Sequence, residues 1–161
     1  MVSAMKAVSA AIAIILVLFA SYEFYAAQVQ QGDFTGSVPS AFTVNGKTYT
    51  FTYSATTPAE RQTGLMNKMI TDATTMLFAF PSFGRWSFWM YDTNTSLDML
   101  WLNATGSTAR VVFMVTDAPP CYDSAGCAVY TPPSPANFVI EAKAGFAAAN
   151  GVAVGTAVTL S

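Results

Sequence analysis

The longest hydrophobic run of the sequence lies at its amino terminus. No charged residue occurs from Ala7 to Tyr22, and Lys6 and Glu23 flank the run. The run forms about 24 Å of helix at roughly 1.5 Å per residue, whereas a bilayer core is about 30 Å thick. A spanning helix must therefore continue to about Ala27, and we predict one long apolar helix within residues 1–28.

Three interpretations of this helix are open. A cleaved export signal needs a small residue at the third position from its end, but signals ending at Ser21 or Ala27 have Phe19 or Tyr25 there, and both are too large. A permanent membrane anchor places Lys6 in the cytoplasm and the rest of the chain outside. In the third interpretation the helix crosses the membrane only before assembly and then lies in the core of a filament.

The filament interpretation draws on the composition of the helix. Its large apolar side chains must lie in lipid or against other copies, because exposing them to water is unfavourable. Small residues between them allow two helices to approach closely. A Glu23 drawn into this core has to pair with a cation such as Lys6 of a neighbouring copy or lie at the solvated edge of the core. The residues expected at the assembly contact are Ala7, Ala10, Ile14, Val17, Leu18 and Glu23.

Alternating patterns beyond residue 40 predict a β-rich domain. Ala41–Val44 and Lys47–Tyr53 flank Asn45-Gly46, which is typical of a two-residue hairpin turn. In the second of these strands aromatic residues alternate with threonine, which gives one apolar and one polar face. Further strands are predicted at Thr75–Phe80, Arg85–Tyr91, Leu97–Asn103, Ala109–Thr116, Asn137–Ala142 and Ala157–Leu160.

One short helix is predicted within this domain. Thr57-Pro58-Ala59-Glu60 forms a capping box with proline at the first helical position, and the helix should continue to about Lys68. The predicted fold class is α+β. It combines the long helix of residues 1–28, a linker at residues 29–40 and a compact, mainly antiparallel β domain at residues 41–161, sandwich-like or barrel-like, with that one short helix.

The composition restricts the function. The chain has 161 residues, of which 53% are hydrophobic and 10% charged, with no histidine and a formal net charge of −2. A weakly acidic chain lacks the basic surface that nucleic acid requires. Without histidine it cannot form a Ser–His–Asp triad or an HExxH zinc site. We therefore expect a protein that is not an enzyme, holds no cofactor or metal and does not bind nucleic acid.

Spaced motifs in the β domain resemble the domain of unknown function family 192. They are Arg61-Gln62-Thr63-Gly64-Leu65-Met66, Met76-Leu77-Phe78-Ala79-Phe80, Phe88-Trp89-Met90 with Thr93 and Leu97-Asp98, and the closing Ile140-Glu141, Ala144-Gly145, Asn150-Gly151 and Gly155. The resemblance spans about 115 residues. It implies a small β-rich α+β domain that an export or anchor segment often precedes, and no reaction is established for the family.

The sequence departs from the pattern of that family at three places. Thr75 replaces the usual glycine, Tyr91-Asp92 replaces Lys-Asn, and Thr95-Ser96 replaces Ile-Pro. These changes favour a scaffold role over a retained ligand site.

The amino terminus carries a second resemblance. Lys6-Ala7-Val8-Ser9, followed by a run of Ala, Ile and Leu, is similar to the start of archaeal type IV pilins and related filament subunits. The resemblance covers about 25 residues. It implies a helix that packs at the axis of a filament.

The two cysteines, Cys121 and Cys127, enclose the loop Tyr-Asp-Ser-Ala-Gly. In an exported domain this arrangement favours a disulfide that closes the loop, and unpaired thiols are the alternative. Two cysteines without histidine make a poor zinc site, because tetrahedral zinc takes four ligands.

The remaining candidate chemistry lies around Trp89. Asp92 and Asp98 could form an acid/base pair or a cation site beside this ring, and Arg61 completes the candidate ligand site. Structural roles compete with this hypothesis. Asp92 suits a turn, Asp98 suits the acceptance of backbone amides, and Arg61 suits a buried charge network with Asp98 and Glu141.

Two sequons agree with an exposed location. Asn94-Thr95-Ser96 and Asn103-Ala104-Thr105 make Asn94 and Asn103 candidate glycosylation sites. Our leading hypothesis is a structural subunit of an extracellular filament, a homo-oligomer that is inserted in the membrane before assembly and ends at the cell surface. The alternative hypothesis is a membrane-anchored extracytoplasmic domain that binds a small ligand such as a sugar.

Overall fold

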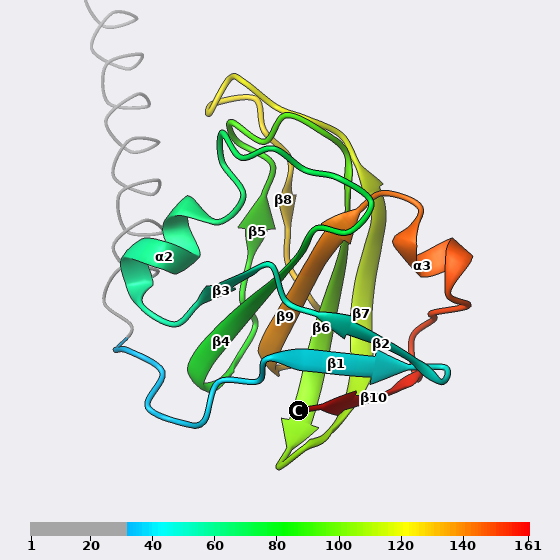
Figure 1. Cartoon of the computed structure of the whole chain (residues 1–161). Coiled ribbons are helices and arrows are strands. Elements are labelled where there is room, and N and C mark those ends of the chain that lie inside the picture. The colour runs from blue at the N-terminus through cyan, green and yellow to red at the C-terminus, as the bar shows by residue number, and fades with distance from the viewer. Residues whose placement is uncertain (1–31) are drawn as a thin grey trace, which may run out of the picture.

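The computed structural model describes residues 32–161, and this part of the chain is mostly β-structure (Figure 1). Its strands are β1 (Ala41–Val44), β2 (Lys47–Thr50), β3 (Tyr53–Ala55), β4 (Thr75–Gly84), β5 (Phe88–Trp89), β6 (Leu97–Thr105), β7 (Thr108–Ala118), β8 (Val129–Tyr130), β9 (Ala136–Lys143) and β10 (Ala157–Leu160). Its helices are α2 (Pro58–Thr63) and α3 (Phe146–Ala149).

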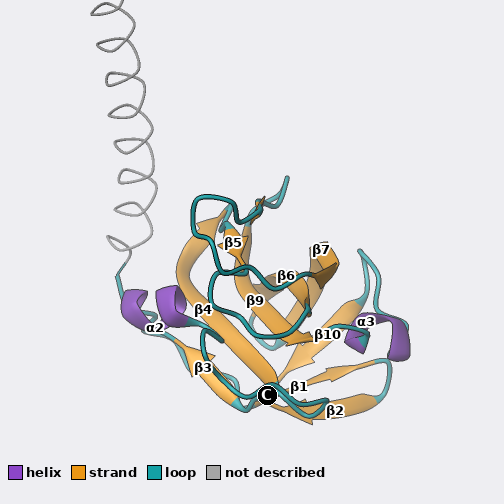
Figure 2. Ribbon diagram, turned by 90° about the horizontal axis from the view of Figure 1, so that it is seen from above, coloured by secondary structure: helices purple, strands orange, loops and turns teal. Residues whose placement is uncertain are grey.

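Eight of these strands form one curled sheet in the order β2-β1-β10-β7-β6-β9-β4-β3, and β5 pairs separately with β8. Neighbouring strands of the large sheet are antiparallel except β3 and β4, which are parallel. Figure 2 shows the curl from above, with β1, β2 and β3 brought round to the same side.

The two edge strands of the sheet, β2 and β3, are consecutive in the chain. Between them the Phe51 N–H donates to the Ser40 carbonyl at 2.9 Å, and the Thr52 N–H donates to the Thr75 carbonyl at 2.9 Å. The chain therefore leaves the β1 side of the sheet at Phe51 and joins the β4 side at Thr52. The curl brings both margins of the sheet to this one point.

Two hydrophobic cores lie on opposite faces of β4, β9 and β6. Along β6, Leu100 and Leu102 face the inner core, whereas Met99 and Trp101 face the outer core, as the two-residue period of a strand requires. The inner core is Phe42, Val44, Leu77, Ala79, Leu100, Leu102, Ala104, Ala109, Val111, Phe138, Ile140, Ala147, Val152, Val158 and Leu160. The outer core is Ala55, Leu65, Met76, Phe78, Phe80, Trp86, Met90, Leu97, Met99, Trp101, Ala118, Ala136 and Val139.

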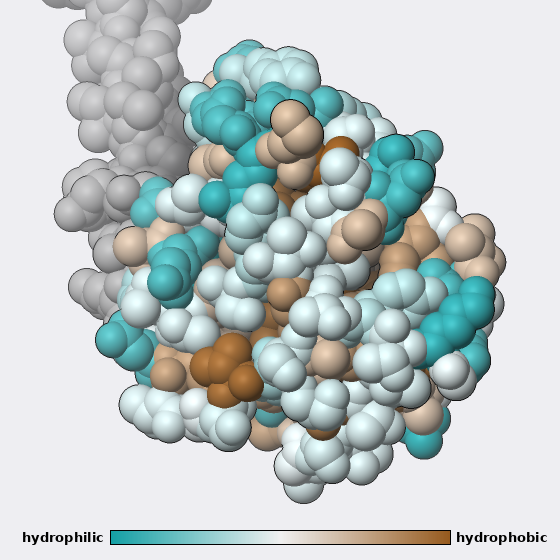
Figure 3. All heavy atoms as spheres, in the orientation of Figure 1, coloured by the Kyte–Doolittle hydropathy of each residue, from teal (hydrophilic) through white to brown (hydrophobic). Residues whose placement is uncertain are grey.

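The surface of the domain carries few charges. On the face in Figure 3 pale, weakly polar side chains predominate, with scattered teal and brown patches. This surface agrees with the low charged content of the chain, of which 10% is charged.

The capping box forms at the start of α2. Thr57 Oγ1 accepts from the Glu60 N–H at 3.3 Å, and Glu60 Oε2 accepts from the Thr57 N–H at 2.9 Å. The Thr56 N–H, which donates to the same carboxylate at 2.8 Å, and the Thr57 N–H together lower the pKa of Glu60 to about 2. The helix ends at Thr63, earlier than the predicted Lys68, because Gly64 adopts a φ of 47° that ends a right-handed helix.

The predicted α+β fold class is wrong. The described chain is mainly β, with two short helices instead of one, and α3 was not predicted because its four residues carry no pattern of their own. In residues 32–161 no helix has the length and apolar character needed to cross a membrane. The long apolar helix predicted within residues 1–28 lies outside the described residues.

Candidate functional site

Three loops meet at one end of the sheet, and we call residues 64–74, 90–96 and 119–128 the loop end. The Asn67 N–H donates to the Asp92 carbonyl at 2.8 Å, and the Asp92 N–H donates to the Cys121 carbonyl at 2.9 Å. The Cys121 N–H in turn donates to the Met90 carbonyl at 3.3 Å. Main-chain hydrogen bonds therefore link all three loops.

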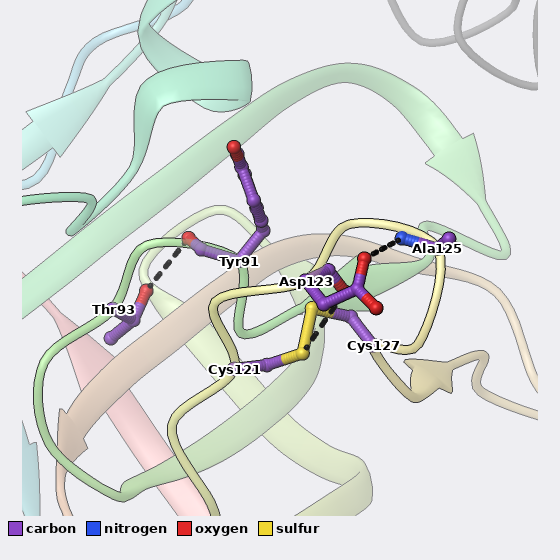
Figure 4. Close-up of a disulfide and its surroundings, with 6 residues drawn as sticks. All are labelled: Tyr91, Thr93, Cys121, Asp123, Ala125 and Cys127. Atoms are coloured by element: carbon purple, nitrogen blue, oxygen red, sulfur yellow. Dashed lines mark hydrogen bonds between the residues drawn. A yellow bond between two sulfur atoms is a disulfide. The ribbon is translucent and has the colours of Figure 1, made fainter.

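A disulfide holds the third of these loops. Cys121 and Cys127 are bonded with a Cα–Cα separation of 5.6 Å. Inside the loop Asp123 Oδ1 accepts from the Ala125 N–H at 3.1 Å, and the Tyr91 side chain points away from the disulfide (Figure 4). Because Cys121 also bonds to Met90 and Asp92, the disulfide fixes the loop against the rest of the loop end.

Removing the disulfide tests this role. We expect the double variant Cys121→Ser/Cys127→Ser to lose about 2 kcal/mol of unfolding free energy, the low end of the range, because the closed loop is short. Urea denaturation of the two proteins measures the difference. Wild type under reducing conditions should match the variant, and equal midpoints for oxidised wild type and variant would show that the disulfide contributes nothing.

Glu141 is the carboxyl that the outer core encloses. It lies on β9 with 4% of its surface exposed, directly opposite Met76 of β4 and Met99 of β6. The same register continues to Tyr53 of β3, which is opposite Met76. One carboxyl therefore lies in a row of otherwise apolar or aromatic side chains, which we call the Glu141 row: Tyr53, Met76, Glu141 and Met99.

The carboxyl of Glu141 has no hydrogen-bond or ion-pair partner among residues 32–161. Burial raises its pKa to about 8, and no neighbouring charge opposes this shift. Glu141 is therefore mainly protonated at neutral pH. The side chain of Glu141 keeps a small contact with solvent, since 4% of its surface is exposed. In residues 32–161 the side-chain polar atom that lacks both solvent contact and a hydrogen-bond partner is Trp86 Nε1.

The charged groups nearest along the strand and in the adjoining loop are engaged elsewhere. Lys143, two residues beyond Glu141 on the same face of β9, pairs with Asp72 at an Nζ–Oδ1 distance of 2.6 Å. Lys68 lies over the Tyr53 ring, 5.0 Å from its centroid. These contacts hold residues 64–74 across the Glu141 side of the sheet while leaving the carboxyl without a counter-charge.

Asp98 has a structural environment. It is 1% exposed, its Oδ1 accepts from the Asp117 N–H at 2.9 Å, and its Oδ2 accepts from the Ala147 N–H at 2.8 Å. Ala147 lies in the first turn of α3, so the carboxylate caps that helix and fastens β7 to β6. Both oxygens are used by backbone donors.

Arg61 binds main-chain carbonyls of two segments. Its Nη1 donates to the Thr56 carbonyl at 2.7 Å and to the Ala79 carbonyl at 3.0 Å. Its guanidinium lies over the Phe80 ring, 5.2 Å from the centroid, and burial lowers its pKa. Arg61 therefore joins α2 to β4.

The structure does not bring the candidate ligand residues together. Trp89 is 36% exposed on β5, with its ring 5.3 Å from the ring of Tyr91, and Asp92 forms a turn at φ 50°. Asp98 and Arg61 occupy the separate structural positions described above. The candidate glycosylation sites Asn94 and Asn103 are both exposed.

Sequence reasoning did not single out the Glu141 row. Met76 and Met99 belong to apolar runs that predict core strands, and Glu141 was weighed only as a member of a charge network. The row depends on the register of four strands, β3, β4, β9 and β6, which come from different parts of the chain. A lone glutamate inside an apolar strand was the available signal.

The curled sheet, its two cores and the linked loop end define a small β domain with one unpartnered carboxyl in its outer core. Residues 41–160 match the family model DUF192, described as Uncharacterized ACR, and the chain belongs to this family. The resemblance inferred from the motifs of the β domain is thereby confirmed.

Two solved structures are similar to this chain. A proposed transcription regulator from Sinorhizobium meliloti is 27% identical with a TM-score of 0.62, and the match covers 78% of this chain and 98% of that protein. A protein of unknown function from Novosphingobium aromaticivorans is 26% identical with a TM-score of 0.62, with 82% and 95% covered. No curated protein matches the chain.

The predicted filament function is wrong. The described chain is a DUF192 domain, its structural neighbours are a proposed regulator and a protein of unknown function, and neither is described as a pilin. The longer of the two helices in residues 32–161, α2, has six residues. The six residues expected at the assembly contact lie outside the described residues.

Proposed function

We propose that this DUF192 domain is a binding domain rather than an enzyme, that it works outside the cytoplasm, and that its ligand contacts the carboxyl of Glu141. The ligand is a small cation or a small hydrogen-bond donor, because those groups satisfy an unpartnered carboxyl. The enclosed, unpartnered state of Glu141 carries this proposal.

The energetics of burial support a ligand at this position. A polar group that is removed from water without a hydrogen bond costs about 1–3 kcal/mol by mutational data. Val139, two residues earlier on the same face of β9, shows that an apolar side chain fits this part of the outer core. Glu141 therefore lowers stability in the free protein, and a ligand that bonds to the carboxyl offsets this cost.

The other parts of the proposal rest on residue chemistry. A disulfide persists in oxidising compartments, which supports a location outside the cytoplasm. The chain has no histidine to act as a general base, which supports binding without catalysis. Its net charge of −2 disfavours nucleic acid as the partner.

Thermal-shift measurements on the full chain test the proposed binding. The probes are sodium, potassium, magnesium, calcium, zinc and silver salts and the chlorides of ammonium, methylammonium and guanidinium, each at pH 7. We expect at least one probe to raise the melting temperature of wild type and to lose this effect in Glu141→Gln. Glu60→Gln is the matched control, because glutamine also serves a capping box.

The outcome decides the proposal in both directions. A stabilising shift that survives in Glu60→Gln and disappears in Glu141→Gln supports binding at Glu141. Equal shifts in wild type and Glu141→Gln, or no shift with any probe, would overturn the proposal.

A further inference from the structure

Two thioethers flank the carboxyl of Glu141 in the Glu141 row. Met76 and Met99 are its direct partners on the neighbouring strands, and both side chains belong to the outer core. Directly opposite residues on adjacent antiparallel strands have Cβ atoms about 4.5–5.5 Å apart. Methionine is unbranched and has three rotatable bonds, so both sulfur atoms can reach a point beside the carboxyl.

Methionine alone does not indicate a ligand site, because it commonly fills gaps in cores. The independent observation is the carboxyl between the two methionines, which is 4% exposed and has no partner in the described chain. One oxygen donor and two sulfur donors thus lie at directly opposite positions of three adjacent strands.

The donor set selects one kind of ion. Thioether sulfur favours soft metals such as Cu(I), whereas calcium takes six to eight oxygen ligands. The described chain contains no cluster of three acidic, cysteine or histidine side chains that would suit a harder ion. A single carboxylate balances the charge of a monovalent ion, so the filled site is neutral, which burial favours.

We propose that Met76, Glu141 and Met99 form a site for a soft monovalent metal ion, with Cu(I) as the ion of this class that a cell supplies. The inference rests on the proposed binding function and specifies its ligand. On binding, the Glu141 carboxyl releases one proton and the metal ion takes its place beside the oxygen, with the oxidation state of the metal unchanged.

Silver(I) is the probe, because it has the same charge and preference for sulfur and needs no reductant. The chain suits this probe, since it has no histidine and both of its cysteines lie in the disulfide. Isothermal titration of the full chain with silver nitrate should give one tight site. Labelled methionine methyl groups should show the largest NMR shifts at Met76 and Met99.

Leucine variants test whether the two sulfur atoms bind the metal, because leucine removes the sulfur and still fills the core. Met76→Leu and Met99→Leu keep volume and apolar character, a swap that usually costs less than about 1.5 kcal/mol. We expect each to weaken silver binding at least tenfold, as Glu141→Gln should. Met69→Leu is the matched control, because Met69 is 84% exposed and lies outside the row. Circular dichroism and melting curves show that each variant is folded.

The possible results separate this inference from the proposed function. Unchanged silver affinity in Met76→Leu and Met99→Leu overturns the metal site. No silver binding, combined with a Glu141-dependent thermal shift by another probe, overturns the metal site and leaves the binding function standing. No Glu141-dependent shift with any probe overturns both.

Discussion

The unfolding free energy of the full chain is expected to fall by about 3–4 kcal/mol between pH 5 and pH 9, and Glu141→Gln should remove most of this decrease. The pKa of Glu141 is about 8 in the folded chain and 4.5 in the unfolded chain. Between these values the folded state holds a proton that the unfolded state has lost, so stability falls as pH rises. The decrease ends once the pH exceeds about 8.

Few other groups titrate in this range. The chain contains no histidine, its cysteines are bonded to each other, and the lowered pKa of Glu60 places that group far below the range. A decrease of the unfolding free energy between pH 5 and pH 9 can therefore be assigned to Glu141.

Urea denaturation at intervals of half a pH unit measures the effect. The expected result is a falling curve for wild type and a nearly flat curve for Glu141→Gln. Glu60→Gln should follow wild type across this range. A wild-type curve as flat as that of Glu141→Gln would contradict the burial of an unpartnered carboxyl.

The second large effect concerns Asp98. We expect Asp98→Asn to lower the unfolding free energy by about 2–4 kcal/mol, because one of the two backbone N–H groups that donate to Asp98 then faces an amide donor instead of a carboxylate oxygen. The loss of stability should be concentrated at α3, since the Ala147 N–H is one of the two donors to Asp98. Hydrogen exchange of the Ala147 and Asp117 amides should accelerate with it.

Asp117→Asn is the matched control for this substitution. Asp117 is exposed and adopts a φ of 53°, a conformation that asparagine tolerates, and only its backbone N–H contacts Asp98. Its unfolding free energy should stay within about 0.5 kcal/mol of wild type. Equal stability of Asp98→Asn and Asp117→Asn would show that the carboxylate of Asp98 does not fasten α3 and β7.

Local sequence signals predicted the elements that depend on nearby residues. The hairpin of β1 and β2 follows from Asn45-Gly46, whose φ angles of 48° and 78° suit the tight turn. The start of α2 follows from the capping box of Thr57 and Glu60. The turn depends on residues 45–46 and the cap on residues 57–60, so the neighbouring sequence contains the whole cause of each.

Elements that depend on distant residues were missed or misjudged. The short helix α3 is fixed by Asp98, which lies 49 residues earlier in the chain. The strand β8 forms only through its pairing with β5, and its two residues carry no alternating pattern. The predicted fold class included the long helix within residues 1–28, which lies outside the described residues, whereas the described chain is mainly β.

The candidate site shows the same limit. Trp89 and the acidic residues near it stood out because they are close in sequence, yet Asp98 and Arg61 serve the backbone at two separate places. Glu141 needed the register of β4, β9 and β6 before its environment could be recognised. A site whose residues lie on adjacent strands cannot be predicted from the residue pattern of one strand alone.

The meeting of both sheet margins at Phe51 and Thr52 makes this short segment a mechanical weak point. Protease cleavage there, or an inserted peptide, separates β2 from β3 and releases the two margins together. A cut in the turn at Gly106 only divides a hairpin whose strands keep their ladder. Attempts to permute the chain or to graft peptides into it should therefore use the Gly106 turn and leave residues 51–52 intact.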